Sequence, residues 1–186
     1  MATRSKTRAH QSANRKLDSS PGGKDALSLL RADHREVKQM FEAYEDLADN
    51  RDKGECAHRI CQALKIHTMI EEEIFYPAAR RATRDDQLLD ESEVEHAGAK
   101  DLIAQIEAMR PGEKLYDAKV AVLGEQVNHH IREEEGELFP EVRDAKMDLV
   151  ELGERMQRRK AELMSQLPSG GTGSEEDAGA QSSPRA

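Results

Sequence analysis

The sequence has few large apolar side chains and no long apolar run. Leu, Ile, Val and Phe together occupy 33 of the 186 positions, a share that would suggest disorder if it held throughout the chain. Between residues 25 and 165 they occupy 31 of 141 positions, so the two ends account for part of the deficit. No segment approaches the roughly 20 consecutive apolar residues of a membrane span. The sequence therefore predicts one modest core with extensions at both ends.

Cysteine is also scarce. Cys56 and Cys61 are too few for a disulfide framework, and their spacing matches no common zinc or thioredoxin motif, so we interpret both as ordinary thiols on a helix. Residues 1–24 lack the apolar region of a secretory signal. Their Arg, Ser and Ala content is similar to that of an organelle transit segment, but they lack an apolar face. A cytoplasmic location is therefore expected.

Positive charge is in deficit overall but not at the start of the chain. The net charge of −9 argues against nucleic-acid binding by the whole surface. Residues 1–24, however, carry six Lys and Arg against one acid, and we interpret them as a disordered basic arm; a weak contact with nucleic acid or another acidic partner is the alternative. Residues 166–186 are rich in Gly, Ser and acids and are expected to form a disordered tail.

Between these ends the apolar residues recur with a helical period. Four main helices and a shorter charged one are expected, over residues 25–48, 55–82, 90–110, 114–145 and 148–164. Pro77 should kink the second helix, because proline lacks the backbone donor, and Pro140 should weaken the fourth. Ser92 and Glu95 have the spacing of a capping box, which leaves the start of the third helix open.

These helices predict an all-α fold, an antiparallel up-down-up-down four-helix bundle with an extra C-terminal helix and disordered tails. The expected divisions are an arm (1–24), the bundle domain (25–146), an accessory helix (147–165) and a tail (166–186). The bundle also repeats itself. Residues 33–47 align with residues 95–109, and residues 67–77 align with residues 130–140, at offsets of 62 and 63. Two helix pairs of related design are therefore expected side by side.

The apolar stripe of each main helix is interrupted by one histidine, and two of the histidines are followed four residues later by glutamate. These six residues are His34, His67, Glu71, His96, His130 and Glu134. A buried polar group without a partner costs roughly 1 to 3 kcal/mol, and an unpaired carboxylate costs more. Six such groups need a common partner, so the pattern predicts a metal site. A hydrogen-bonded polar layer that fixes the helix register is the alternative.

The residue types indicate which metals fit. Imidazole nitrogen and carboxylate oxygen suit iron, manganese or zinc, and no cysteine belongs to the set. Six ligands are too many for one tetrahedral zinc, whereas two ions bridged by carboxylates and a solvent oxygen would use them all. Ferritin-type sites place Glu and His three residues apart and use more Glu than His, so that comparison fails.

With its His, HxxxE, His, HxxxE pattern, the sequence resembles the hemerythrin-like HHE family over residues 25–146. The aromatic-proline segments IFYP (74–77) and ELFP (137–140) also agree. The resemblance implies a hemerythrin-like bundle that holds two irons. It implies that the six residues are their ligands and that Glu71 and Glu134 bridge the two ions.

The sequence departs from the oxygen-carrying hemerythrins at two positions. Lys100 stands where those carriers place a second histidine in the third helix, and Glu134, four residues after its histidine, stands where they place an aspartate five residues after it. The resemblance therefore implies a protein that binds or senses dioxygen, nitric oxide, peroxide or iron, in stress response, more than a carrier. The alternatives are a diiron oxidoreductase that decomposes peroxide as a catalase does, and a metal-free helical interaction protein.

Several polar residues near the six have weaker patterns. His129 and Glu133 also have HxxxE spacing but lie beside the apolar stripe, so we expect them to be solvated or to contact a ligand indirectly. Glu72, Glu73 and Glu135 are expected on exposed acidic faces, with the orientation of a ligand histidine as the alternative. Tyr44 is expected to pack in the core; a hydrogen bond to bound oxygen is the alternative.

Overall fold

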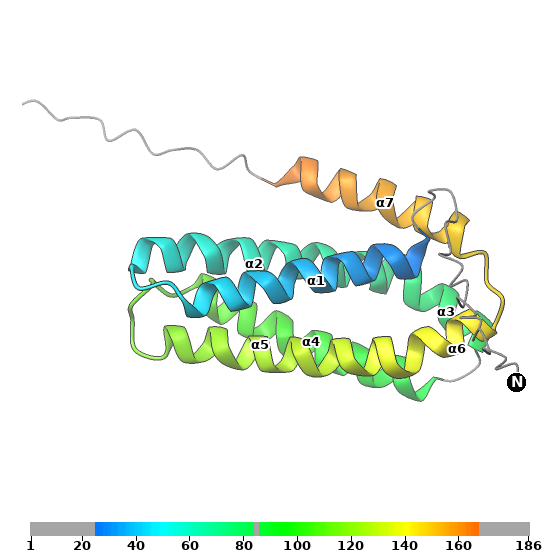
Figure 1. The fold of residues 1–186 in the computed structure, drawn as a ribbon, viewed down its shortest axis with the longest axis horizontal. Coiled ribbons are helices and arrows are strands. Elements are labelled where there is room, and N and C mark those ends of the chain that lie inside the picture. Colours follow the sequence, from blue (N-terminus) through cyan, green and yellow to red (C-terminus); the bar gives the residue numbers. More distant parts are fainter. Residues whose placement is uncertain (1–24, 84–85, 168–186) are drawn as a thin grey trace, which may run out of the picture.

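The computed structural model describes residues 25–83 and 86–167, and every element within them is helical. The elements are α1 (Ala26–Glu45), α2 (Asn50–Ile70), η1 (Glu71–Phe75), α3 (Tyr76–Thr83), α4 (Gln87–Glu107), α5 (Tyr116–Glu133), η2 (Glu134–Leu138), α6 (Phe139–Asp144) and α7 (Leu149–Gln166). The sets α2–η1–α3 and α5–η2–α6 each form one long helix, so that with α1 and α4 they make an antiparallel four-helix bundle (Figure 1). The expected all-α bundle with an extra C-terminal helix is confirmed. The predicted disorder of residues 1–24 lies outside the described residues, as does the predicted tail (166–186) apart from residues 166 and 167, of which Gln166 ends α7.

Two helix starts differ from the sequence prediction. The second helix begins at Asn50 instead of residue 55, because the Asp49 carboxylate accepts hydrogen bonds from the backbone N–H groups of Arg51 and Asp52 (2.8 and 3.3 Å) and caps the first turn. The third begins at Gln87, so the capping-box spacing of Ser92 is not used: its buried hydroxyl donates to the backbone carbonyl of Leu88 (2.9 Å).

The core consists of two apolar clusters with the histidines and glutamates between them. One cluster gathers at the end of the bundle that holds α3 and α6 and includes Leu30, Ile70 and Phe139; the other fills the opposite end and includes Phe41, Ile60 and Leu123. No helix of the described residues is both long and apolar enough to cross a membrane. The apolar clusters position a polar layer at mid-depth, where it is shielded from water.

The expected kinks take the form of two π-helical turns, η1 and η2. In them the Tyr76 N–H donates to the carbonyl of Glu71, and the Phe139 N–H donates to the carbonyl of Glu134, each five residues back. Pro77 and Pro140 each lie two residues beyond the π turn. A proline there cannot donate to the carbonyl four residues back and its ring would clash with it, so the wider turn suits both positions. Each wide turn begins at one of the two buried glutamates.

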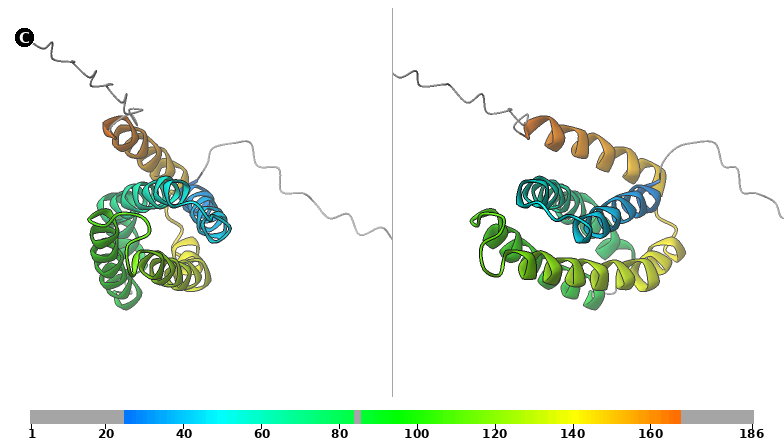
Figure 2. Two further views of the ribbon diagram at one scale, coloured as in Figure 1. Left: turned by 90° about the vertical axis from the view of Figure 1, so that its left-hand side faces the viewer. Right: turned by 60° about the vertical axis from the view of Figure 1, so that its left-hand side comes forward.

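The last helix, α7, lies outside the ring of four helices and packs against α1 and α2 (Figure 2). It buries Leu152, Met156 and Leu163 in the first apolar cluster. Its Arg159 binds both carboxylate oxygens of Glu73 (2.7 and 3.1 Å). The helix is therefore fastened to the bundle by apolar packing and by ion pairs close to the polar layer.

Candidate metal centre

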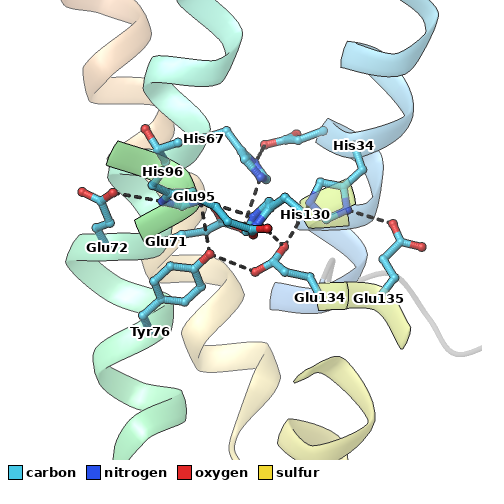
Figure 3. Close-up of polar contacts among 12 residues, drawn as sticks. His34, His67, Glu71, Glu72, Tyr76, Glu95, His96, His130, Glu134 and Glu135 are labelled. Carbon is cyan, nitrogen blue, oxygen red and sulfur yellow. Dashed lines mark hydrogen bonds and ion pairs between the residues drawn. The ribbon is translucent and has the colours of Figure 1, made fainter. Parts of the chain in front are cut away.

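All six residues that the sequence singled out meet in the polar layer (Figure 3). Each is buried, with exposed fractions from 0% for Glu71 to 7% for His67 and His130. The helices α1, α2, α4 and α5 each contribute one histidine, and η1 and η2 each contribute one glutamate. The two halves of the chain therefore contribute equally to one buried cluster.

The two glutamates lie between the histidines of the two halves. Glu71 directs one oxygen toward Nε2 of His67 (3.2 Å) and the other toward Nε2 of His96 (3.4 Å). The Oε2 atom of Glu134 is 3.3 Å from Nε2 of His34 and 3.7 Å from Nε2 of His130. Each glutamate thus faces one histidine from each half of the chain.

These atoms form two adjacent groups with the spacing of metal ligands. His34, His67, Glu71 and Glu134 bring their donor atoms within 4.8 Å of one another, and so do Glu71, His96 and His130. Ligands that bind one ion at about 2.0 to 2.2 Å lie roughly 3 to 3.5 Å apart, and three of the four distances given above fall in this range. Glu71 belongs to both groups, so the arrangement suits two neighbouring ions.

Several of these buried atoms have no hydrogen-bond partner among the described residues. They include both oxygens of Glu71, Oε2 of Glu134 and the Nε2 atoms of His34 and His67. All are electron-pair donors that face the same space, and buried polar groups are almost always satisfied. Cations between them would satisfy all of these atoms, so the donor set fits a metal pair.

The outer nitrogen of each imidazole faces another carboxylate. The Nδ1–H of His34 donates to Glu135 (2.8 Å), that of His96 to Glu72 (2.9 Å) and that of His130 to Glu95 (2.8 Å). The Nδ1 atom of His67 is 3.7 Å from Asp33. The pairs follow the repeat. Asp33 and Glu95, which precede the first histidine of each half, face the second histidine of the same half. Glu72 and Glu135, which follow the buried glutamates, face a histidine of the other half. An Nδ1–H that donates outward leaves the Nε2 lone pair facing the centre.

The electrostatics favour the neutral imidazole at His96 and at His67, whereas at His130 the Glu95 and Glu134 carboxylates outweigh burial and raise the pKa. Burial, together with the nearby His130, lowers the pKa of His96 to about 4, and burial also lowers the pKa of His67. Burial and the neighbouring Glu134 carboxylate raise the pKa of Glu71. Burial acts in the same direction on Glu134, but its contacts with His34 and His130 outweigh it and hold its pKa below the usual value. A cation would favour the ionised form of both glutamates.

The comparisons with known proteins agree with this geometry. The sequence pattern of the "Hemerythrin HHE cation binding domain" family matches residues 25–142. The chain belongs to this family. A protein from Nostoc sp. (strain PCC 7120 / SAG 25.82 / UTEX 2576), named as a DNA nickase, is 30% identical over 118 residues, which are 62% of this chain and 33% of that protein. The chain thus matches about a third of the length of that relative.

A solved structure shares the fold. The crystal structure of a hemerythrin HHE cation-binding domain-containing protein from Mycobacterium kansasii matches with a TM-score of 0.66 and 23% identity. The match covers 76% of this chain and 88% of that one. It supports the architecture of the HHE bundle described above.

One residue of the HHE centre was missed by the sequence reasoning. The buried hydroxyl of Tyr76 donates to Oε1 of Glu134 (3.1 Å) and lies 3.3 Å from Nε2 of His96. The repeat aligns Tyr76 with Phe139, whose ring stacks on His34 with centroids 5.9 Å apart. The alignment matched the two as aromatic residues and gave no sign that one hydroxyl enters the centre. The two halves of the HHE site therefore differ by this hydroxyl.

Other polar residues correct or support the expectations. Glu72 and Glu135 do not only form exposed acidic faces, because they bind the outer nitrogens of His96 and His34. The alternative, that these acids orient a ligand histidine, therefore agrees with the geometry of both. Glu73 remains at the surface with Arg159. Tyr44 lies in the apolar cluster away from the centre and donates to Asp117 (2.7 Å), so it does not reach the HHE site.

Lys100 and the cysteines also have defined surroundings. The Lys100 ammonium binds both oxygens of Glu72 at 2.6 Å, so it supports the carboxylate that orients His96. Both cysteines lie on α2, as expected of helix thiols, and burial raises the pKa of the Cys61 thiol to about 11. A thiol protonated to that degree is a poor metal ligand at neutral pH.

A cavity of about 130 Å³ reaches the HHE centre from the side of α7. All four histidines line it, together with apolar side chains such as Val37, Leu64 and Val127, and Lys160 and Met164 of α7 form part of its outer wall. A space of this size admits a molecule of a few atoms. The wall is largely apolar, so it favours small uncharged ligands.

Proposed function

We propose that this HHE domain holds two iron ions through His34, His67, Glu71, His96, His130 and Glu134, without haem. The observation that carries the proposal is Glu71, whose two buried, unpaired oxygens face histidines from opposite halves of the chain. This is the arrangement of a bridging carboxylate. Manganese or zinc fit the same donors, and a solvent oxygen would complete the bridge.

Iron in such a centre supplies an open coordination position and redox chemistry for dioxygen, nitric oxide or peroxide. The chain's own residues prepare the surroundings. Glu72, Glu95 and Glu135 hold the imidazoles with Nε2 inward, and Tyr76 offers a hydroxyl that can donate a hydrogen bond beside His96. The largely apolar walls of the cavity disfavour bulk water beside the centre.

The surroundings of Lys100 favour sensing or processing of the small ligand over reversible transport. Lys100 is engaged with Glu72 at the surface and supplies no donor to the His96 side, where the carriers have a second histidine. An ion held on that side would therefore have fewer protein ligands and would keep exchangeable solvent. The proposal includes a role in a cytoplasmic stress response, which rests on the resemblance to the family.

DNA cleavage is not part of the proposal. The name of the Nostoc relative applies to a protein about three times as long as the matched segment. In the present chain all six residues of the centre are buried and Glu71 is 0% exposed, so a phosphodiester backbone could not contact its carboxylate.

Metal analysis of the purified protein tests the proposal directly. We expect about two irons per chain after iron loading and removal of weakly bound ions on a desalting column. Glu71→Ala should lose both ions, because a bridging carboxylate serves each of them. Glu137→Ala is the matched control, since Glu137 lies in the same type of turn but is exposed. Full metal content in the Glu71→Ala protein would refute the bridging role.

Two further measurements separate the alternatives. Reduced iron-loaded protein is exposed to air and then purged with argon while the absorption of the centre is followed. We expect irreversible oxidation. Full return of the reduced spectrum over repeated cycles would indicate a carrier. Oxygen release from added peroxide would support the catalase-like oxidoreductase. A protein that takes up no metal, with its helices intact, would favour the metal-free interaction protein.

A further inference from the structure

Glu95, His129 and Glu133 form a third group of possible metal ligands outside the buried centre. His129 and Glu133 are one turn apart on α5, and Glu95 reaches them from α4. Nε2 of His129 is 3.1 Å from Oε1 of Glu133 and 3.6 Å from Oε1 of Glu95. The group lies at the surface, with 54% of the His129 side chain exposed, so an ion can enter it from solvent.

The spacing suits one ion. Donor atoms bound to a tetrahedral metal at about 2.0 to 2.1 Å lie roughly 3.3 Å apart, and the two measured distances bracket this value. The three donor atoms all lie within 4.8 Å of one another. Three protein ligands would leave the fourth position to water, as in other open sites.

An ordinary ion pair does not account for the whole group. A histidine and a glutamate one turn apart often pair on a helix surface. Here two carboxylates from different helices face one nitrogen, which carries at most one proton and can donate a good hydrogen bond to only one of them. A divalent cation would bind both carboxylates and the nitrogen together.

We propose that Glu95, His129 and Glu133 bind a third metal ion, a divalent first-row transition cation such as Zn²⁺. One imidazole and two carboxylates suit this class better than Mg²⁺ or Ca²⁺, which prefer oxygen donors alone. The site is exposed and has only three ligands, so it binds more weakly than the buried centre. It is distinct from the two ions proposed above, since it uses none of the six central residues.

The third site is connected to the buried centre through Glu95. One oxygen of this carboxylate faces His129, and the other accepts the Nδ1–H of His130 (2.8 Å), whose Nε2 faces the buried centre. An ion on Glu95 would therefore weaken its hold on His130. Occupancy of the surface site should change the properties of the ion that His130 holds.

Zinc uptake by the whole chain tests the proposal. The protein with its tightly bound ions is dialysed against increasing Zn²⁺ and the zinc per chain is measured. The wild type should take up one more Zn²⁺ than His129→Ala at concentrations that saturate the weaker site, and Glu133→Gln should weaken this uptake at least tenfold. Glu125→Gln is the matched control, because this exposed acid lies one turn before His129 on the same helix, whereas Glu133 lies one turn after it. Excess Mg²⁺ should not displace the zinc.

Replacement by a different ligand separates coordination from structural disturbance. His129→Cys supplies a thiolate, a good zinc ligand, and should retain the extra ion that His129→Ala loses. Equal zinc uptake by the wild type and His129→Ala would overturn the proposal, as would uptake that depends on Glu125. The difference at His129 can be measured whether the buried centre holds two ions, one or none, so it does not depend on the proposed diiron function.

The connection has its own readout. In the iron-loaded protein, added Zn²⁺ should shift the absorption of the iron centre or its azide affinity in the wild type but not in His129→Ala. An identical response in both proteins would show that the surface ion does not act on the centre through Glu95.

Discussion

At the scale of single residues, the centre depends on outer partners as much as on the donor atoms themselves. Each histidine faces the centre with one nitrogen and a carboxylate with the other, and Lys100 and Lys160 bind two of these carboxylates, Glu72 and Asp33. The carboxylates fix the ring orientation and raise the basicity of the inner nitrogen. Residues that touch no metal should therefore affect its affinity.

Glu72 provides the test of this outer layer. Glu72→Ala removes the acceptor of the His96 Nδ1–H and the partner of Lys100, so metal affinity should fall about 10- to 100-fold, as is typical when such a partner is lost. Competition with a chelator of known affinity measures the change. Glu73→Ala is the control, because this neighbouring acid faces Arg159 at the surface. Equal affinities of the two variants would argue against an orienting role for Glu72.

The Tyr76 hydroxyl is the second residue-scale test. Tyr76→Phe removes the donor to the buried Glu134 carboxylate, and a hydrogen bond to a charged group contributes about 1.5 to 3 kcal/mol. We expect a loss of that size in the free energy of urea unfolding of the metal-free protein, together with weaker azide binding by the iron-loaded protein. Tyr44→Phe also breaks a bond to a carboxylate, that of Asp117, but should leave azide binding unchanged. Loss of azide affinity in both variants would point to general loosening of the bundle.

At the scale of elements, each π-helical turn runs from a buried glutamate of the centre toward a proline two residues beyond the turn. The sequence showed Pro77 and Pro140 at equivalent places and predicted a disturbance of each helix. The sequence did not show that each disturbance is a π-helical turn beginning at Glu71 or Glu134. A backbone N–H bonds to the carbonyl five residues back, instead of four, only where the packing of the whole helix favours it. The HxxxE spacing of four is readable in the sequence, whereas the turn that directs the glutamates is not.

The C-terminal helix α7 is an integral part of the core, and a pair of methionines on it tests this. Met156 is fully buried in the first apolar cluster, whereas Met164 is 56% exposed. Met156→Ala should lower the free energy of unfolding by about 2 to 5 kcal/mol, the usual cost of such a cavity. Met164→Ala should change it by no more than about 0.5 kcal/mol. Urea unfolding of both variants measures the contrast; equal, small losses would mean that α7 is not held to the bundle.

At the scale of the whole molecule, a polar layer separates two apolar clusters, so we expect the bundle to be weakest at the proposed metal centre. Ions that bind only the folded state stabilise it by about 4 kcal/mol when their concentration is a thousand times the dissociation constant. For a chain of this size that corresponds to a change in Tm of roughly 10 °C.

Metal removal tests this dependence. The chelated protein should melt lower than the metal-loaded protein at matched pH and salt, as followed by circular dichroism, and re-addition of iron should restore the melting temperature. Glu71→Ala controls for effects of the chelator itself, since a protein that cannot hold the ions should melt at the same temperature with and without it. Identical melting of chelated and loaded wild type would show that the polar layer is not organised around metal.

The sequence alone determined the helical architecture and the six central residues, because both follow from local periodicity. Helical spacing places His67 and Glu71 on one face of their helix, and the repeat places His130 and Glu134 on the corresponding face of another. Only the tertiary structure decided which carboxylate each imidazole meets, that Tyr76 and not Tyr44 enters the centre, and that Glu95 lies between His130 and His129. These contacts join residues from different helices, and their geometry depends on helix rotation and packing, which the period of one helix does not specify.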